Sequence, residues 1–172
     1  MNNSTKPAIM PGETIGIIGG GQLGQMMTMA AKSMGYRVLI LDPQADFPGW
    51  QVADGQIIAA YDSEAQIIEL AQKSDVVTYE FENVDAATIE KAQAFSQFPQ
   101  GTKALRISQD RVLEKQFLAA QELPHAAFEV VTTEVELTTA VAKIGLPAIL
   151  KTTRGGYDGK GQLVLNRAVD LA

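Results

Sequence analysis

An apolar segment, a glycine-rich turn and a helical pattern follow one another directly near the start of the chain. Residues 14–18 suit a short buried strand, and the next six are Gly19-Gly20-Gly21-Gln22-Leu23-Gly24. Apolar residues then recur at helical spacing and predict one buried helix face, made of Leu23, Met26, Met27, Ala30, Ala31 and Met34. We expect Gly35 to end this helix in a left-handed conformation. A strand that turns tightly into a helix is typical of parallel α/β sheets.

The alternation of strand and helix continues up to residue 95. Further strands are expected at 38–41, 57–59 and 76–79, with helices after Ser63 and Asp85. Such connections cover both faces of a parallel sheet with helices and leave ligands at the carboxyl ends of the strands. The predicted fold class is therefore α/β, with a Rossmann-like parallel sheet over residues 14–105 after a disordered tail at residues 1–13.

A break at Phe98-Pro99-Gln100-Gly101 precedes a second set of elements. The expected elements are a helix at 110–121, a strand at 127–131, a helix at 134–144 ended by Gly145, two strands flanking a loop at 151–162, and a helix from Ala168. These are too few to close a core of their own. Residues 106–172 are therefore expected to be the start of a larger domain.

Composition narrows the classes of function. The chain carries 14 basic and 20 acidic residues, a net charge of −6, which argues against a general nucleic-acid surface. It has no cysteine, which excludes disulfides and thiolate metal sites. No apolar run approaches the roughly 20 residues of a membrane helix, and the polar first residues do not form a signal peptide. A cytoplasmic protein that binds neither nucleic acid nor membrane is expected.

The segment from Lys151 to Gln162 combines glycines with cations. Four glycines fall within residues 155–161, and Lys151, Arg154 and Lys160 carry positive charge. Glycines let backbone N–H groups approach a ligand, and lysines add point charges that suit phosphate. Lys151 ends a strand that is expected to be buried, where an unpaired lysine would be costly. The segment predicts a loop that closes over a nucleoside triphosphate.

The first glycine loop leaves three interpretations open. It fits G-x-G-x-x-G, and Asp42 ends the next strand, as in a dinucleotide site with pyrophosphate at the helix N-terminus. It also fits a turn that needs glycine only for packing, or a site for a nucleotide-like substrate without NAD. Glu80 and Glu82 follow the fourth strand, and at most one of them is expected to face the ligand.

Three motifs together resemble the N5-carboxyaminoimidazole ribonucleotide synthases of the ATP-grasp superfamily. They are the glycine loop 19–24 before a methionine-rich helix, Tyr79-Glu80-Phe81-Glu82-Asn83-Val84, and Gly155-Gly156-Tyr157-Asp158-Gly159-Lys160-Gly161-Gln162. The resemblance implies a pre-ATP-grasp domain followed by the start of an α+β ATP-grasp domain. It also implies a ligase of purine biosynthesis that carboxylates 5-aminoimidazole ribonucleotide with ATP and bicarbonate, through carboxyphosphate.

The resemblance carries roles onto matching positions of this chain. ATP-binding residues would be Arg111, Lys151, Gly156, Tyr157, Asp158, Gly159, Lys160, Gly161 and Gln162. Substrate-binding residues would be Gly21, Gln22, Leu23, and Glu80 or Glu82. No catalytic residue is assigned. The Mg²⁺ ligands are expected beyond residue 172, so this segment alone is expected to be inactive, and the full-length protein is expected to be a homodimer.

Three alternatives stay open. The formate-dependent glycinamide ribonucleotide transformylases, also ATP-grasp enzymes, share the glycine loop, the strand-ending lysine and the Gly-Lys-Gly-Gln loop end. The stretch from Arg154 to Asp158 favours the carboxylating family, because we expect a serine-rich loop in the other. An NAD-dependent oxidoreductase would use the first glycine loop and Asp42, but it leaves Lys151 to Gln162 unexplained. A non-catalytic nucleotide-binding module is the third alternative.

Overall fold

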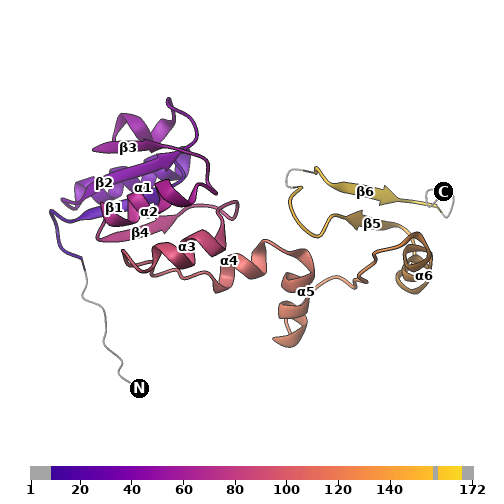
Figure 1. Cartoon of the computed structure of the whole chain (residues 1–172). Helices are drawn as coiled ribbons and strands as arrows, with labels where there is room; N and C mark the ends of the chain where they lie inside the picture. The colour runs from indigo at the N-terminus through magenta and orange to yellow at the C-terminus, as the bar shows by residue number, and fades with distance from the viewer. Residues whose placement is uncertain (1–8, 157–158, 168–172) are drawn as a thin grey trace, which may run out of the picture. The chain divides into compact units, whose positions relative to one another are not determined.

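The computed structural model describes residues 9–156 and 159–167. The chain divides into two compact units after Leu105 (Figure 1). Residues 1–8 of the predicted disordered tail lie outside the described residues. The prediction of disorder is wrong for residues 9–13, because the Gly12 N–H donates to the carbonyl oxygen of Gly35 over 2.8 Å. The Tyr36 hydroxyl also donates to the carbonyl oxygen of Ile9 over 3.2 Å.

The first unit is a four-stranded parallel sheet with helices on both faces, as predicted for an α/β fold (Figure 1). The strands lie in the order β3-β2-β1-β4 and are β1 (Thr14–Ile18), β2 (Arg37–Asp42), β3 (Gly55–Ile58) and β4 (Val76–Tyr79). The helices are α1 (Gln22–Ser33), the 3₁₀ helix η1 (Pro48–Gln51), α2 (Glu64–Gln72), α3 (Ala86–Ala92) and α4 (Lys103–Ser108). Helix α4, which was not predicted, spans the division between the units.

Side-chain alternation along the strands builds two cores, one on each face of the sheet. Ile17 of β1 and Ile40 of β2 are paired in register, and both pack with Ala31 of α1 and with Phe47. The next residues, Ile18 and Leu41, point to the opposite face and pack with buried residues of α2 and α3. The central strands are therefore apolar on both faces, as a covered parallel sheet requires.

The direction in which successive strands are added to the sheet reverses at β1. From β1 it runs outward to β2 and β3, and then crosses to β4 on the other side of β1. The carboxyl ends of β1 and β4 therefore adjoin, with Ile18 registered against Tyr79. Open α/β sheets bind ligands at such a switch point. The glycine turn leaves β1 here, and Glu80 follows β4 at the same edge.

The buried face of α1 agrees with the predicted apolar face only at Ala31, which is buried, and at Met27, which is partly buried. The helix buries Gly24, Thr28 and Ala31, whereas Leu23, Met26 and Met34 are each more than half exposed. Small residues face the sheet because the helix starts so close to β1 that a methyl group at Gly24 would lie 2.3 Å from the Gly19 carbonyl oxygen. The Thr28 hydroxyl turns back to donate to the carbonyl oxygen of Gly24 over 2.7 Å. Close backbone packing thus decides the orientation of this helix.

Two helices and a β-hairpin make up the second unit. They are α5 (Arg111–Ala120), α6 (Glu134–Ile144), β5 (Ala148–Lys151) and β6 (Gln162–Leu165). A capping box between Thr133 and Glu136 starts α6, and Gly145 ends it with a φ of +89°. The predicted strand at 127–131 is wrong, because no described strand pairs with this segment. The predicted helix from Ala168 lies outside the described residues.

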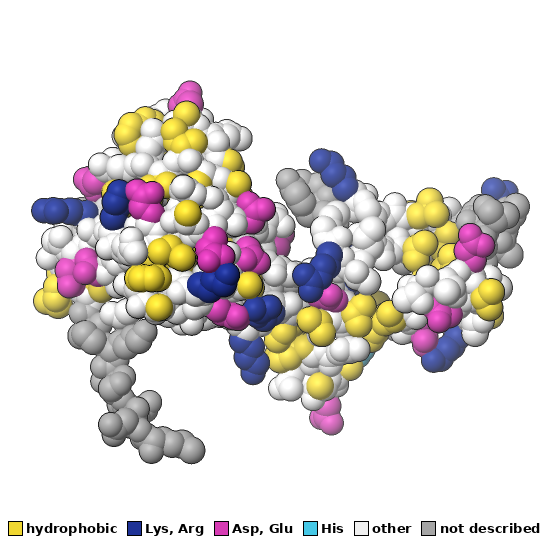
Figure 2. Space-filling model, viewed as in Figure 1, with side chains coloured by type: hydrophobic (Ala, Val, Ile, Leu, Met, Phe, Trp, Pro, Cys, Tyr) yellow, Lys and Arg dark blue, Asp and Glu magenta, His cyan; other side chains and the backbone are white. Residues whose placement is uncertain are grey.

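The β5–β6 hairpin pairs antiparallel, with Lys151 registered against Gln162. It is not the buried sheet that its apolar sequence predicts, since Ile149 and Leu163 are each 54% exposed and Lys151 is exposed. Figure 2 shows hydrophobic side chains at the surface over the hairpin. Lys151 is therefore not buried, so the cost of burying an unpaired lysine does not indicate an anionic partner for it. None of the helices among the described residues is long and apolar enough to cross a membrane.

Candidate functional site

The glycine turn after β1 is closed on one side by the segment that contains η1. The Gly49 N–H donates to the Gly20 carbonyl oxygen over 2.8 Å, and the Gln25 side chain donates to the Pro48 carbonyl oxygen over 2.9 Å. The Phe47 ring lies so close that a methyl group at Gly20 would be 2.2 Å from it. Packing inside the protein therefore requires the glycine at Gly20. This agrees with the interpretation of the loop as a turn that needs glycine for packing.

Asp42 ends β2 and is buried, with 5% of its surface exposed. Its Oδ2 accepts hydrogen bonds from the Gly20 N–H over 2.8 Å and from the Tyr61 hydroxyl over 2.7 Å. Its Oδ1 accepts from the Gln44 N–H over 2.9 Å. Both oxygens of this carboxylate are thus bound by the protein's own groups. This use differs from that in a dinucleotide site, where the residue at this position binds ribose hydroxyls.

Tyr61 connects Asp42 to the segment after β4. Its ring packs edge-to-face against Phe81, with 4.6 Å between the ring centroids and an interplanar angle of 71°. Burial raises the pKa of the Tyr61 hydroxyl, and the hydrogen bond to the Asp42 carboxylate raises that pKa further. The hydroxyl therefore stays protonated and remains a hydrogen-bond donor.

Glu80 lies over the glycine turn. A methyl group at Gly19 would be 2.6 Å from the Glu80 Cγ and 2.8 Å from its Oε1, and one at Gly21 would be 3.3 Å from the same oxygen. Gly19 also has a φ of +104°, which glycine adopts without strain. Glu82 is exposed, and none of the nearest atoms to a methyl group at Gly19 or Gly21 belongs to it. Of the two predicted carboxylates, Glu80 is the one beside the turn.

The start of α1 lies next to Glu80. Gly21 is the residue that precedes the helix, and as a glycine it has no side chain to cap it. Gln22 and Leu23 follow in the first turn and are exposed. The first N–H groups of a helix have no partner within the helix and carry a partial positive charge. The site thus offers backbone donors beside a carboxylate acceptor.

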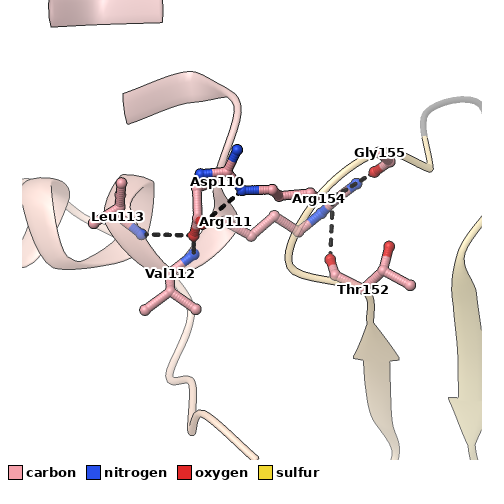
Figure 3. Close-up of polar contacts among 7 residues, drawn as sticks. All are labelled: Asp110, Arg111, Val112, Leu113, Thr152, Arg154 and Gly155. Carbon is pink, nitrogen blue, oxygen red and sulfur yellow. Dashed lines mark hydrogen bonds and ion pairs between the residues drawn. The ribbon is translucent and has the colours of Figure 1, made fainter. Parts of the chain in front are cut away.

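Arg111 organises the second glycine loop. Its guanidinium donates to the carbonyl oxygens of Thr152 over 3.2 Å, Gly155 over 2.7 Å and Gly156 over 2.8 Å. The Arg111 N–H also donates to the Thr153 carbonyl oxygen over 2.8 Å. Figure 3 shows the side chain reaching from the first turn of α5 to the loop. The planar, multiply donating guanidinium suits this task better than an ammonium group would.

Asp110 makes a second connection between α5 and the loop. Its Oδ1 caps the helix by accepting from the N–H groups of Val112 over 3.0 Å and Leu113 over 3.2 Å. Its Oδ2 pairs with the Arg154 Nε over 3.2 Å (Figure 3). The hydrogen bond from Leu113, with those from Val112 and Arg154, lowers the pKa of this carboxyl below its ordinary value. The sequence placed Arg154 among the cations of the loop, but it predicted neither the role of Asp110 in this site nor its pairing with Arg154.

The two arms of the glycine loop touch near its base. The Thr152 N–H donates to the Gly161 carbonyl oxygen over 2.9 Å. Gly156 has a φ of +68°, and a methyl group there would lie 2.4 Å from the Lys160 carbonyl oxygen. Tyr157 and Asp158 lie outside the described residues. The other predicted ATP-binding residues of the loop and its flanking strands are exposed, namely Lys151, Gly159, Lys160, Gly161 and Gln162.

Metal ligands do not gather in the part of the chain that the structure describes. Within residues 9–156 and 159–167, no three aspartate, glutamate, histidine or cysteine side chains come together as a candidate metal site. The position of any Mg²⁺ ligands therefore remains a prediction.

Comparison with known proteins identifies both parts of the chain. Residues 12–109 match the family model described as the ribonucleotide synthetase preATP-grasp domain. The chain belongs to this family. Residues 116–172 match the family model of the ATP-grasp domain. A region similar to ATP-grasp domains therefore follows the preATP-grasp domain in this chain.

Two relatives of this preATP-grasp chain carry the name N5-carboxyaminoimidazole synthase or synthetase, with or without the word ribonucleotide. The chain is 46% identical to the N5-carboxyaminoimidazole ribonucleotide synthase of Bacillus subtilis, over 97% of this chain and 44% of that protein. A solved N5-carboxyaminoimidazole synthetase from Staphylococcus aureus, complexed with ADP, matches with 44% identity and a TM-score of 0.91, over 95% of this chain and 44% of that one.

A more distant solved structure adds a second ligand. The synthase from Aspergillus clavatus, in complex with ADP and 5-aminoimidazole ribonucleotide, matches with 28% identity and a TM-score of 0.84, over 95% of this chain and 43% of that one. The chain therefore spans less than half the length of the relatives it matches.

Proposed function

We propose that the full-length protein is an ATP-dependent ligase that carboxylates 5-aminoimidazole ribonucleotide with bicarbonate in purine biosynthesis. A bicarbonate oxygen attacks the γ-phosphorus of ATP, which gives carboxyphosphate and ADP. The exocyclic amine of the ribonucleotide then attacks the carboxyl carbon and phosphate leaves. The observation that carries the proposal is the Glu80 carboxylate against the turn at Gly19 and Gly21. Similarity to synthases along both parts of the chain supports it.

The substrate side of the proposed site is the switch point of the sheet. Glu80 accepts a hydrogen bond from an amine or hydroxyl of the ribonucleotide, and the N–H groups at the start of α1 donate to its acceptor atoms. Gly21, Gln22 and Leu23 contribute these donors. Glu82, which is exposed, is not part of the proposed contact. A carboxylate held beside backbone donors suits a ligand that both donates and accepts hydrogen bonds.

The ATP side is the loop that Arg111 organises. Phosphoryl transfer depends mainly on positioning and on stabilising negative charge. Backbone N–H groups from Gly156 to Gln162, with Lys151 and Lys160, supply donors and charge for the phosphates, and Arg111 holds the base of the loop in place. Tyr157 and Asp158 keep their proposed roles on the resemblance alone. Mg²⁺ would neutralise the phosphates when bound, through ligands that we expect beyond residue 172.

An NAD-binding oxidoreductase is disfavoured by the contacts of Asp42. Its oxygens accept from Gly20, Gln44 and Tyr61, so they are already used within the protein. The Glu80 carboxylate also lies where a pyrophosphate would approach the start of α1. Titration of the protein with NADH, followed by its fluorescence, tests this alternative. Saturable micromolar binding would revive the oxidoreductase.

The glycinamide ribonucleotide transformylase is the nearer alternative, and substrate dependence separates it from the proposed enzyme. ADP release by the full-length protein is measured with 5-aminoimidazole ribonucleotide plus bicarbonate, and with glycinamide ribonucleotide plus formate. We expect stimulation by the first pair only. Stimulation by the second pair alone would overturn the proposal.

Lys151 gives a test of the ATP side. We expect Lys151→Ala in the full-length protein to raise the KM for ATP at least tenfold while the KM for 5-aminoimidazole ribonucleotide changes less than threefold. The Lys151 side chain is exposed at the end of β5, so the substitution leaves the fold intact. An unchanged KM for ATP would remove Lys151 from the site.

We also propose that the full-length protein is a cytoplasmic homodimer, on the resemblance to its family. The exposed methionine-rich face of α1, which includes Met26 and Met34, is an apolar surface that supports association. Light scattering of the eluting full-length protein measures its mass. A monomer at micromolar concentration would contradict the homodimer.

A further inference from the structure

Asp42 and Tyr61 form a buried pair that the proposed reaction does not use. Tyr61 donates to Asp42 over 2.7 Å, and the same carboxylate oxygen accepts from the Gly20 N–H over 2.8 Å. This carboxylate therefore connects the end of β2 to the glycine turn and to the segment after β3. A buried carboxylate is retained only with such partners.

An aromatic contact connects the Asp42–Tyr61 pair to the segment that carries Glu80. The Tyr61 ring meets Phe81 edge-to-face at 4.6 Å. The Cε1 of Phe81 would lie 2.8 Å from a methyl group at Gly19, next to the approach of the Glu80 side chain to the same position. Phe81 and Glu80 are thus packed on the glycine turn as neighbours in sequence and in space.

We propose that Asp42 and Tyr61 are positioning residues of the ribonucleotide site, which hold Phe81 and Glu80 against the glycine turn without touching the ligand. This inference rests on the proposed function, since it assigns the support of the carboxylate that would accept the substrate's amine. The hydroxyl of Tyr61 fixes its ring, the ring fixes Phe81, and Phe81 limits the positions open to Glu80. Catalytic and binding groups need this kind of support to keep a productive geometry.

The pair also shapes what the start of α1 binds. Asp42 takes the Gly20 N–H as an internal donor, so the donors left for a ligand begin at Gly21. Two carboxylates, those of Asp42 and Glu80, flank the turn. Their charge opposes a dianionic phosphate at this helix end and favours a neutral group that donates a hydrogen bond.

The test is Tyr61→Phe in the full-length protein, which keeps the ring beside Phe81 and removes only the hydroxyl. We expect the KM for 5-aminoimidazole ribonucleotide to rise at least fivefold while the KM for ATP changes less than twofold. Tyr36→Phe is the matched control, because it also deletes one hydroxyl bond to the protein, that to Ile9, at a distance from the turn. The control should leave both KM values within twofold of the wild type.

The second variant is Asp42→Asn, which weakens acceptance from both Gly20 and Tyr61 and should raise the same KM more than Tyr61→Phe does. If it does not fold, Tyr61→Phe decides. Equal changes in the two KM values, or a lower melting temperature with neither KM changed, would overturn the positioning role while the proposed function stands. A wild type without turnover that depends on 5-aminoimidazole ribonucleotide would overturn both.

Discussion

The guanidinium of Arg111 donates a hydrogen bond to the carbonyl oxygen of Gly156 over 2.8 Å, and so joins the start of α5 to a loop 45 residues later. It reaches Thr152 and Gly155 in the same way. In this structure Arg111 binds the backbone of the loop that is proposed to cover ATP. The role that we propose for Arg111 in nucleotide binding is therefore to shape the loop, beside any contact with phosphate.

Replacement of Arg111 by lysine tests this role. Lysine keeps the charge but cannot donate to three carbonyl oxygens in one plane. We expect Arg111→Lys in the full-length protein to raise the KM for ATP at least tenfold. Lys143→Met, which removes a surface cation paired with Glu129, should change it less than twofold. A normal KM for ATP in Arg111→Lys would mean that only the charge matters.

Substitutions at two adjacent glycines of the loop distinguish backbone strain from steric overlap. Gly155 and Gly156 have φ values of +67° and +68°, but a methyl group meets nothing within 4 Å at Gly155 and meets the Lys160 carbonyl oxygen at 2.4 Å at Gly156. Gly155→Ala should cost only the left-handed backbone, about 1–2 kcal/mol. Gly156→Ala should in addition open the loop and raise the KM for ATP several-fold more. Equal KM values for the two variants would contradict the packing of the loop arms.

The packing of α1 predicts a large loss of stability at a buried residue, Gly24, and almost none at an exposed one, Met26. Gly24→Ala places a methyl group 2.3 Å from a backbone oxygen and should destabilise the first unit by about 1–3 kcal/mol. Met26→Ala changes a side chain that is 58% exposed and should stay within about 0.5 kcal/mol of the wild type. Urea unfolding of the 172-residue chain measures both. A larger effect at Met26 would restore the apolar face predicted from the sequence.

Asp110 makes the stability of α5 depend on pH. Because the folded state lowers the pKa of this carboxyl, its contribution is fully present above the ordinary pKa of about 4 and is lost as the pH falls through the lowered folded value. Asp110→Ala should remove a cap contribution of about 1 kcal/mol at pH 7 and a smaller one at pH 2. Unfolding followed at both pH values checks this. A cost that is the same at pH 2 and pH 7 would show that the carboxylate charge plays no part.

Local signals predicted much of the fold. Gly35 and Gly145 end their helices with positive φ values, as their position after an apolar repeat indicated. The glycine turn after β1 and the loop between β5 and β6 were also found at their predicted places. Each of these features depends on a few neighbouring residues, so a single sequence can reveal it. Helix α4 was missed because six residues carry too little periodicity.

Features that depend on distant contacts were not predictable. The orientation of α1 follows from the close approach of Gly24 to the Gly19 carbonyl oxygen, which outweighs the methionine pattern. The partners of Asp42 include Tyr61, 19 residues later, and Arg154 reaches Asp110 across 44 residues. The Ser108-Gln109-Asp110 stretch before a helix did contain a cap signal that could have indicated Asp110.

Oxygen transfer from bicarbonate to phosphate tests the central claim most directly. The full-length protein is incubated with ATP, 5-aminoimidazole ribonucleotide and bicarbonate labelled with oxygen-18, and the phosphate released is examined by mass spectrometry. The proposed reaction predicts one labelled oxygen in each phosphate, because a bicarbonate oxygen attacks the γ-phosphorus and stays bonded to it when the amine takes the carboxyl group. Release of unlabelled phosphate would contradict it.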